Sequence, residues 1–257
     1  MDHRLAQQLG AHMQPLTTAV RFLTLLPWPI SPATSTTQDI TRAIAWFPVV
    51  GLIIGLLLLP VGWLTGTVWD AGVRAVGIVI VWGIITAGLH LDGLSDTFDA
   101  VMSWRPRERK LAIMRDSQVG VMGVLAVVAV LLFKFVWLQA SDDNWWRAVI
   151  LAPVWGRWAQ VYGLHWFPSA RNDGLGHAFQ SQTGGQRSFF AATAAALLIT
   201  ISVAPLSGIV AGLLVWGSVL LLAYWWNRVL GGLTGDTYGA LCEISEVVVL
   251  ATLAAAS

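Results

Sequence analysis

Long apolar stretches alternate with short polar segments along this chain of 257 residues. A transmembrane helix needs about 20 mostly apolar residues, and six stretches approach that length. A seventh, weaker stretch runs from Val247 to the C-terminus, where we expect a partial span or an interfacial helix. The pattern predicts an all-α fold, a polytopic transmembrane helical bundle with about six to seven spans. The six expected spans are Trp46–Val68, Ala75–Leu91, Val119–Leu138, Trp146–Leu164, Phe189–Val203 and Gly208–Trp226.

The composition agrees with a membrane protein. Hydrophobic residues make up 56% of the chain and charged residues only 11%, so there is too little polar surface to cover a soluble globule. The net charge of +1 gives no basic field, and nucleic acid is therefore not an expected partner. Because no repeat or composition break divides the chain, we expect residues 1–257 to form one membrane domain, with residues 1–45 as a cytoplasmic or interfacial N-terminal segment.

Basic residues are distributed unevenly between the two sides of the expected bundle. If the N-terminus is cytoplasmic, the outside loops carry only Arg74 and Arg147. Cytoplasmic loops of membrane proteins are enriched in Lys and Arg, so we expect this orientation, with every long polar loop inside. The basic residues of the inside segments are Arg4, Arg21, Arg42, Arg105, Arg107, Arg109, Lys110, Arg115, Arg171, Arg187 and Arg228.

A first group of carboxylates follows the second expected span. Asp92, Asp96 and Asp99 are separated by four and three residues, which places them on one face if the helix continues. Carboxylates in membrane helices are costly and usually mark function. Such close like charges repel unless a cation lies among them, and hard oxygen ligands suit Mg²⁺ or Mn²⁺. The alternative is an acidic helix end exposed to solvent.

A second group of carboxylates follows the sixth expected span. Asp236, Glu243 and Glu246 come after a glycine-rich turn and are spaced by seven and three residues, as on one helical face. Glycines permit tight turns and close approach of the backbone to a ligand. An ordinary loop leading into a helix would give a similar sequence, but both acidic groups are expected on the same side of the membrane.

Arginines near the acidic groups are candidate ligands for anions. The basic segment between the second and third spans is interpreted either as a diphosphate clamp or as a segment that sets topology and binds lipid headgroups. Within it, Arg115, Asp116 and Ser117 lie next to the third span. Lys134 and Arg157 lie inside apolar stretches; we expect Lys134 to snorkel or pair structurally, and Arg157 to reach an anionic ligand.

Carboxylates and arginines at one face of a helical bundle favour metal-assisted transfer of a phosphate-linked group. A metal ion offsets the charge of a diphosphate, arginines stabilise the leaving phosphate, and a carboxylate accepts the proton of the attacking hydroxyl. These residues alone do not identify the substrate.

Residues 90–97, HLDGLSDT, closely resemble the HLDGLADT signature of the cobalamin synthase (adenosylcobinamide-GDP ribazoletransferase) family. Three further segments match that family in the same order. They are residues 113–123 (IMRDSQVGVMG), the Arg157-Trp158 pair, and residues 232–240 (GLTGDTYGA) followed by Glu243 and Glu246. The resemblance extends from Phe22 over most of the chain, although Leu25 stands where the family usually has Arg.

The resemblance implies transfer of adenosylcobinamide phosphate from adenosylcobinamide-GDP to α-ribazole or its 5′-phosphate, with release of GMP. It also implies a Mg²⁺-dependent enzyme, with Mn²⁺ as a possible substitute, in the inner membrane of a prokaryote. The expected partners are corrinoid and ribazole small molecules and the bilayer, and oligomers are compatible with the fold. The implied catalytic residues are Asp92, Asp96, Asp236 and Glu243. The implied metal ligands are Asp92, Asp96, Asp99, Asp236, Glu243 and Glu246. The implied phosphate-binding residues are Arg115, Asp116, Ser117 and Arg157.

Two other classes of membrane protein were weighed against this interpretation. The first class is other membrane transferases with acidic helices. CDP-alcohol phosphotransferases need a DG-x2-AR segment, but Asp92-Gly93 is followed by Leu-Ser-Asp-Thr, so the motif lacks its Arg. Intramembrane prenyltransferases space their acidic residues differently. A transporter is expected to place charges near the bilayer midplane on discontinuous helices. Because the acidic residues here are expected at one face of the membrane, the sequence favours an enzyme.

Overall fold

The structure, a computed structural model, describes residues 14–27, 42–173, 177 and 185–256. These ranges are almost entirely helical, beginning with a helix over residues 14–23. Arg4 and most of the expected N-terminal segment lie outside the described residues. The later helices are η1 (Ile44–Trp46), α3 (Phe47–Gly66), α4 (Ala71–Ile85), α5 (Leu89–Val101), α6 (Arg107–Ile113), α7 (Val121–Ala140), η2 (Asp142–Asn144), α8 (Trp145–Trp166), α10 (Gly185–Val203), α11 (Ser207–Leu230) and α12 (Gly235–Ala254).

Five of the described helices are long and apolar enough to cross a membrane. They are η1 with α3, α7, α10, α11 and α12, and the bent pair α4–α5 passes the same test as a sixth. Leucine and valine side chains on the outer faces of α7 and α11 are exposed, as expected for surfaces in contact with lipid. The expectation of a helical membrane bundle is therefore confirmed.

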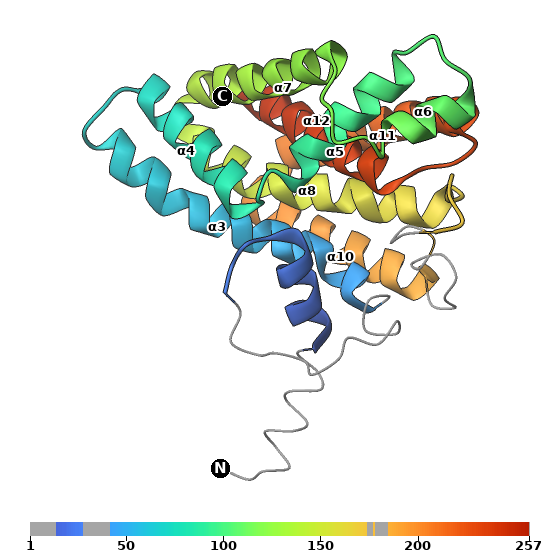
Figure 1. The fold of residues 1–257 in the computed structure, drawn as a ribbon. Helices are drawn as coiled ribbons and strands as arrows, with labels where there is room; N and C mark the ends of the chain where they lie inside the picture. Colours follow the sequence, from blue (N-terminus) through green and yellow to red (C-terminus); the bar gives the residue numbers. More distant parts are fainter. Residues whose placement is uncertain (1–13, 28–41, 174–176, 178–184, 257) are drawn as a thin grey trace.

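Helix α8 occupies the centre of the bundle. Figure 1 shows it crossing the molecule with α12 on one side and α3 and α10 on the other, and it packs against each of them. Every residue from 148 to 164 is buried. Glycines allow the close approach: a Cβ atom on Gly55 of α3 would lie 2.8 Å from the Ile150 Cα. Helix α8 is thus the core helix of the bundle. It corresponds to the expected span Trp146–Leu164, but it is not among the described helices that are long and apolar enough to cross a membrane.

The second expected span, Ala75–Leu91, is not a straight helix. Helices α4 and α5 meet at an angle of 88°, and the intervening Ala87 and Gly88 have φ angles of 54° and 64°. The break leaves backbone carbonyls at the end of α4 without the partners that a continuous helix would provide. One of them, the Ile85 carbonyl, instead accepts a hydrogen bond from the Leu25 N–H at 2.8 Å. The expected span therefore passes the hydropathy test only as a bent pair of helices: a left-handed turn interrupts it, and α5 leaves in a new direction.

The last helix is longer than the sequence suggested. Helix α12 runs from Gly235 to Ala254 without a break, so the weak seventh stretch is the second half of a full helix. Asp236 lies at its start, and Glu246 lies ten residues further along, about 15 Å into the bundle. The expectation of a partial span from Val247 was therefore wrong, and the second acidic group is distributed along the depth of the bundle.

Four charged side chains, here called the charge cluster, meet inside the bundle: Lys134, Arg157, Glu243 and Glu246. Lys134 Nζ lies 2.7 Å from the Glu243 carboxylate and also pairs with Glu246, which in turn pairs with Arg157. None of these side chains is more than 4% exposed. The two cations and two anions balance in charge, which is the condition under which buried ions are tolerated.

The charge cluster changes the interpretation of three residues from the sequence. Glu243 and Glu246 were expected to join the aspartates in a metal site, but the structure pairs them with buried cations. Arg157 was expected to reach a phosphate, but it is fully buried and bonded to Glu246. Lys134 pairs structurally, as expected, and also lies 4.4 Å from the centre of the Trp82 ring.

Removing one charge from the cluster is expected to destabilise the bundle strongly. Lys134→Ala would leave two carboxylates facing one cation, and removal of one partner of a buried pair costs about 3–5 kcal/mol. The double variant Lys134→Met/Glu243→Gln removes one charge of each sign and leaves the Arg157–Glu246 pair. We expect it to be clearly more stable than Lys134→Ala in thermal unfolding of the detergent-purified protein. Equal stability of the two variants would contradict the charge-balance argument.

Candidate functional site

Three segments meet at one end of the bundle, here called the site end. The loop after α8 pairs with the turn between α11 and α12: Ala170 N–H donates to the Leu233 carbonyl and Leu233 N–H donates to the Pro168 carbonyl, both at 2.8 Å. Arg107 of α6 donates to the Leu230 carbonyl at 2.6 Å and to the Ala170 carbonyl at 3.1 Å. These bonds fix the start of α12 against α6 and α8.

The glycine-rich turn is shaped for this contact. Gly231 and Gly232 have φ angles of 72° and 147°, which favour glycine, and a Cβ atom on Gly232 would lie 2.5 Å from the Ala170 nitrogen. Thr234 then caps α12 through a reciprocal pair of hydrogen bonds with Thr237. Asp236 consequently lies in the first turn of α12, where the helix dipole favours a carboxylate.

Close packing brings α5 beside the start of α12. A Cβ atom on Gly93 would lie 2.8 Å from the Asp236 carbonyl oxygen, and one on Gly239 would lie 3.2 Å from the His90 carbonyl oxygen. Asp92 and Asp236 therefore lie close to each other although they come from different helices. Asp96 lies one turn further along α5 and is half-buried.

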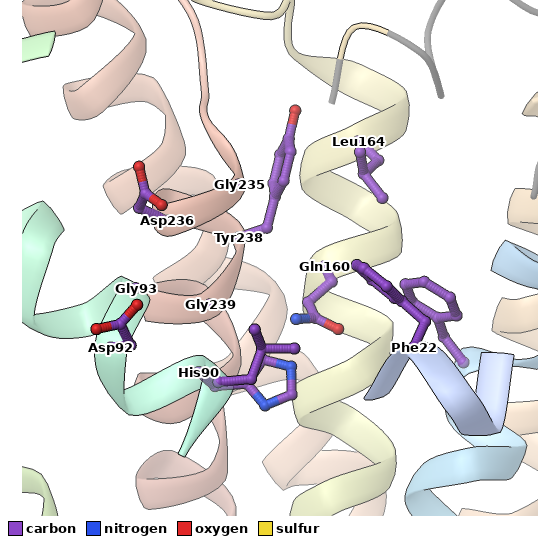
Figure 2. A pocket seen from close by; sticks show the side chains of 12 residues that line it. Phe22, His90, Asp92, Gly93, Gln160, Leu164, Gly235, Asp236, Tyr238 and Gly239 are labelled. Carbon is purple, nitrogen blue, oxygen red and sulfur yellow. The ribbon is translucent and has the colours of Figure 1, made fainter. Parts of the chain in front are cut away.

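Asp92 and Asp236 line a cavity of about 220 Å³ at the contact of α5, α8 and α12. Figure 2 shows the two carboxylates near each other on one side, with His90, Gln160 and Phe22 on the other. The cavity thus has a charged end and a mostly apolar end. The lining residues are Phe22, Phe47, Leu89, His90, Asp92, Gly93, Gln160, Leu164, Gly235, Asp236, Tyr238 and Gly239.

Three buried polar residues of this cavity were missed in the sequence analysis. His90 Nε2, Gln160 Oε1 and the Tyr238 hydroxyl are buried and have no hydrogen-bond partner among the described residues. Gln160 was the easiest to detect, because it is an isolated amide within an apolar stretch. Tyr238 and His90 lie inside segments quoted for their carboxylates, and their own side chains were not considered.

Asp99 has a structural role in this arrangement. Its carboxylate accepts hydrogen bonds from the Gly120 N–H at 2.7 Å and the Gly123 N–H at 2.8 Å, at the start of α7. Unpaired N–H groups at a helix start favour such a carboxylate. Both oxygens of Asp99 are therefore used to attach α7 to α5, whereas the sequence suggested a metal ligand.

Three of the four expected phosphate-binding residues lie in an exposed loop at the site end, and the fourth, Arg157, is in the charge cluster. Arg115 pairs with Asp173 at 2.6 Å, Asp116 accepts a hydrogen bond from the Gln118 N–H at 3.1 Å, and Ser117 is exposed. None of the three lines the cavity. The sequence analysis counted Arg171 only as a basic loop residue, but its guanidinium lies 3.4 Å from the Asp236 carboxylate.

The six carboxylates do not form one metal site. Among the described residues, no group of three or more His, Cys, Asp or Glu side chains is arranged to hold a metal ion. Mg²⁺, however, usually keeps several waters and binds one or two carboxylates together with substrate phosphates. Asp92, Asp96 and Asp236 provide suitable oxygen donors at the site end, so this smaller set fits the ion.

Comparison with known proteins identifies the family. The family model described as cobalamin-5-phosphate synthase matches residues 15–254. A Roseiflexus protein named adenosylcobinamide-GDP ribazoletransferase is 56% identical, over 93% of this chain and 88% of its own. Relatives of the same name are 42% identical in Herpetosiphon aurantiacus, over 93% of this chain and 96% of theirs, and 37% identical in Desulfitobacterium hafniense, over 93% and 95%. No solved structure matches the chain.

The family match covers the site and the bundle together. It includes α5 with its aspartates, the turn before α12 and the charge cluster. The chain therefore belongs to the cobalamin-5-phosphate synthase family of membrane-bound transferases.

Proposed function

We propose that this chain transfers adenosylcobinamide phosphate from adenosylcobinamide-GDP to α-ribazole or α-ribazole 5′-phosphate. The products are GMP and adenosylcobalamin or its phosphate, which makes this the last step of nucleotide loop assembly. The names of the relatives support the substrates. The observation on the structure that supports the chemistry is the pair of carboxylates, Asp92 and Asp236, that two helices bring to one cavity.

The transfer replaces one phosphorus–oxygen bond by another. A ribose hydroxyl of the acceptor attacks the phosphorus attached to cobinamide, and the bond from that phosphorus to the bridging oxygen of the diphosphate breaks. The bridging oxygen leaves as part of GMP. The hydroxyl proton passes to a carboxylate, and Asp92 suits this role because it lines the cavity and forms no ion pair in the described part of the chain.

Asp96 and Asp236 would hold Mg²⁺, or Mn²⁺ in its place, beside Asp92. When bound, the ion would offset the negative charge of the diphosphate. Arg171 lies beside Asp236 and is proposed to contact the leaving phosphate, together with Arg115 from the exposed loop. Glu243, Glu246 and Arg157 are proposed to act only through the fold, since their charges are buried and paired.

We place the protein in the inner membrane of a prokaryote with the site end in the cytoplasm. Basic residues of α6 and its neighbouring loops, including Arg107, Lys110 and Arg171, lie at that end. The broken α4–α5 helix and the mid-bundle charges are features that transporters also have. Here the charges are balanced and buried against one another, which favours a structural role for them in an enzyme.

Turnover by the purified protein tests the proposed function. With adenosylcobinamide-GDP and α-ribazole 5′-phosphate, we expect GMP and a new corrinoid to form in equal amounts. Removal of divalent metal with EDTA should stop both, and added Mg²⁺ or Mn²⁺ should restore them. Full turnover in EDTA would rule out the metal proposal, and GMP release without a new corrinoid would rule out the transfer.

Single changes of Asp92, Asp96 and Asp236 to Asn are expected to lower kcat by about 100-fold or more. A change at a metal ligand should also raise the Mg²⁺ concentration needed for half-maximal rate, whereas a change at the base should lower kcat even at saturating Mg²⁺. The matched control is Glu108→Gln on exposed α6, which should keep normal kcat. Near-normal turnover in all three Asn variants would contradict the proposed site.

Arg115 and Asp173 provide a test of the phosphate contacts. If Arg115 serves only to pair with Asp173, Arg115→Ala and Asp173→Ala should have the same effect on turnover. We expect Arg115→Ala and Arg171→Ala to raise KM for adenosylcobinamide-GDP about tenfold, the usual scale for a lost charged hydrogen bond. Asp173→Ala should change this KM little. Equal KM values in Arg115→Ala and Asp173→Ala would remove Arg115 from the site.

A further inference from the structure

The apolar end of the cavity contains polar atoms that the transfer chemistry does not use. His90 is 2% exposed, and Gln160 and Tyr238 are each 5% exposed. Each has a polar side-chain atom that finds no hydrogen-bond partner among the described residues, and each lines the cavity. Buried polar groups in proteins are normally bonded, so this combination indicates a ligand that bonds them.

The charge cluster fixes which nitrogen of His90 can donate. The Arg157 guanidinium lies 3.5 Å from His90 Nδ1. A guanidinium only donates hydrogen bonds, so this contact favours the tautomer in which Nδ1 accepts and the ring hydrogen is on Nε2. His90 therefore presents an N–H donor, and that donor is the unpartnered atom of the ring.

The rest of this end is apolar and suits a flat ring. Phe22, Phe47, Leu89 and Leu164 line it together with the Tyr238 ring. A volume of about 220 Å³ is below the roughly 300–1,000 Å³ of pockets that take whole drug-sized ligands, so one ring system of a larger ligand fits better. A lipid acyl chain would leave the polar atoms unbonded, and guanine has polar groups on more edges than this lining can match.

We propose that this end of the cavity binds the heterocyclic base of the acceptor nucleoside, and that the His90 Nε2–H donates to its free ring nitrogen. The inference rests on the proposed function and adds the part of the substrate that binds here and the residue that recognises it. The benzimidazole of ribazole is largely apolar and has one unsubstituted ring nitrogen, which accepts a hydrogen bond. With the base beside His90, the ribose extends toward the charged end, where Asp92 and Asp236 lie (Figure 2).

The test uses a pair of acceptors that differ in one atom. One is α-ribazole, and the other is the matching indole nucleoside, in which C–H replaces the free ring nitrogen. Equilibrium binding to the detergent-purified protein is measured without the nucleotide donor. We expect the wild-type protein to bind α-ribazole at least about tenfold more tightly than the indole analogue, because the analogue leaves a buried donor unpaired.

Substitutions at His90 assign the preference to its side chain. His90→Leu should bind the two nucleosides alike, whereas His90→Gln, which keeps a donor, should retain part of the preference. Thr97→Val is the matched control, since Thr97 is a buried α5 residue with an unpartnered hydroxyl outside this cavity. It should retain the full preference, and all variants should keep a normal KM for adenosylcobinamide-GDP.

Failure of this inference differs from failure of the proposed function. The base-binding role would be overturned if the wild-type protein bound both nucleosides equally. It would also be overturned if the only effect of His90→Leu were on the KM for adenosylcobinamide-GDP. Absence of GMP and of a new corrinoid with wild-type protein would instead overturn the transfer reaction, whatever the nucleoside preference.

Discussion

An ion buried in a membrane protein needs a partner of opposite charge, and this requirement organises the bundle. Lys134 on α7 and Arg157 on α8 can be neutralised only if the two glutamates of α12 lie between them. The position of α12 is thereby fixed, and with it the position of Asp236 at its first turn. Arg157 of this cluster also contacts His90 Nδ1, which favours the tautomer with the ring hydrogen on Nε2.

The second constraint is the left-handed turn at Ala87 and Gly88. A straight continuation of α4 would carry the three aspartates away from α12. The turn instead directs α5 along α12, and Gly93 and Gly239 let the two backbones approach closely. Asp99 then anchors the start of α7. The carboxylates of α5 thus have different roles: Asp99 holds the start of α7, while Asp92 and Asp96 lie at the site end, where they can contact a metal ion or substrate.

Much of this arrangement was predictable from the pattern of apolar residues and acidic groups. The expected spans near α3, α7, α10 and α11 agree with hydropathy, whereas α8 is not among the helices apolar enough to cross a membrane. The sequence analysis also assigned Asp92 and Asp236 to one site. The role of Glu243 and Glu246 was not predictable, because helical spacing shows that carboxylates share a face and cannot show which cations oppose them. The α4–α5 bend was missed because Thr-Ala-Gly is compatible with an apolar helix, and Gln160 because its neighbours come from three other segments.

The placement of both glutamates on α12, which follows α7 and α8 in the chain, has a consequence for biosynthesis. Helices α7 and α8 leave the ribosome well before α12, so their two cations enter the membrane without partners. Assembly of the interior must therefore wait until α12 has been translated, because only then can its glutamates pair with Lys134 and Arg157. A nascent chain interrupted before Gly235 would hold two uncompensated positive charges within its membrane helices, which is energetically costly.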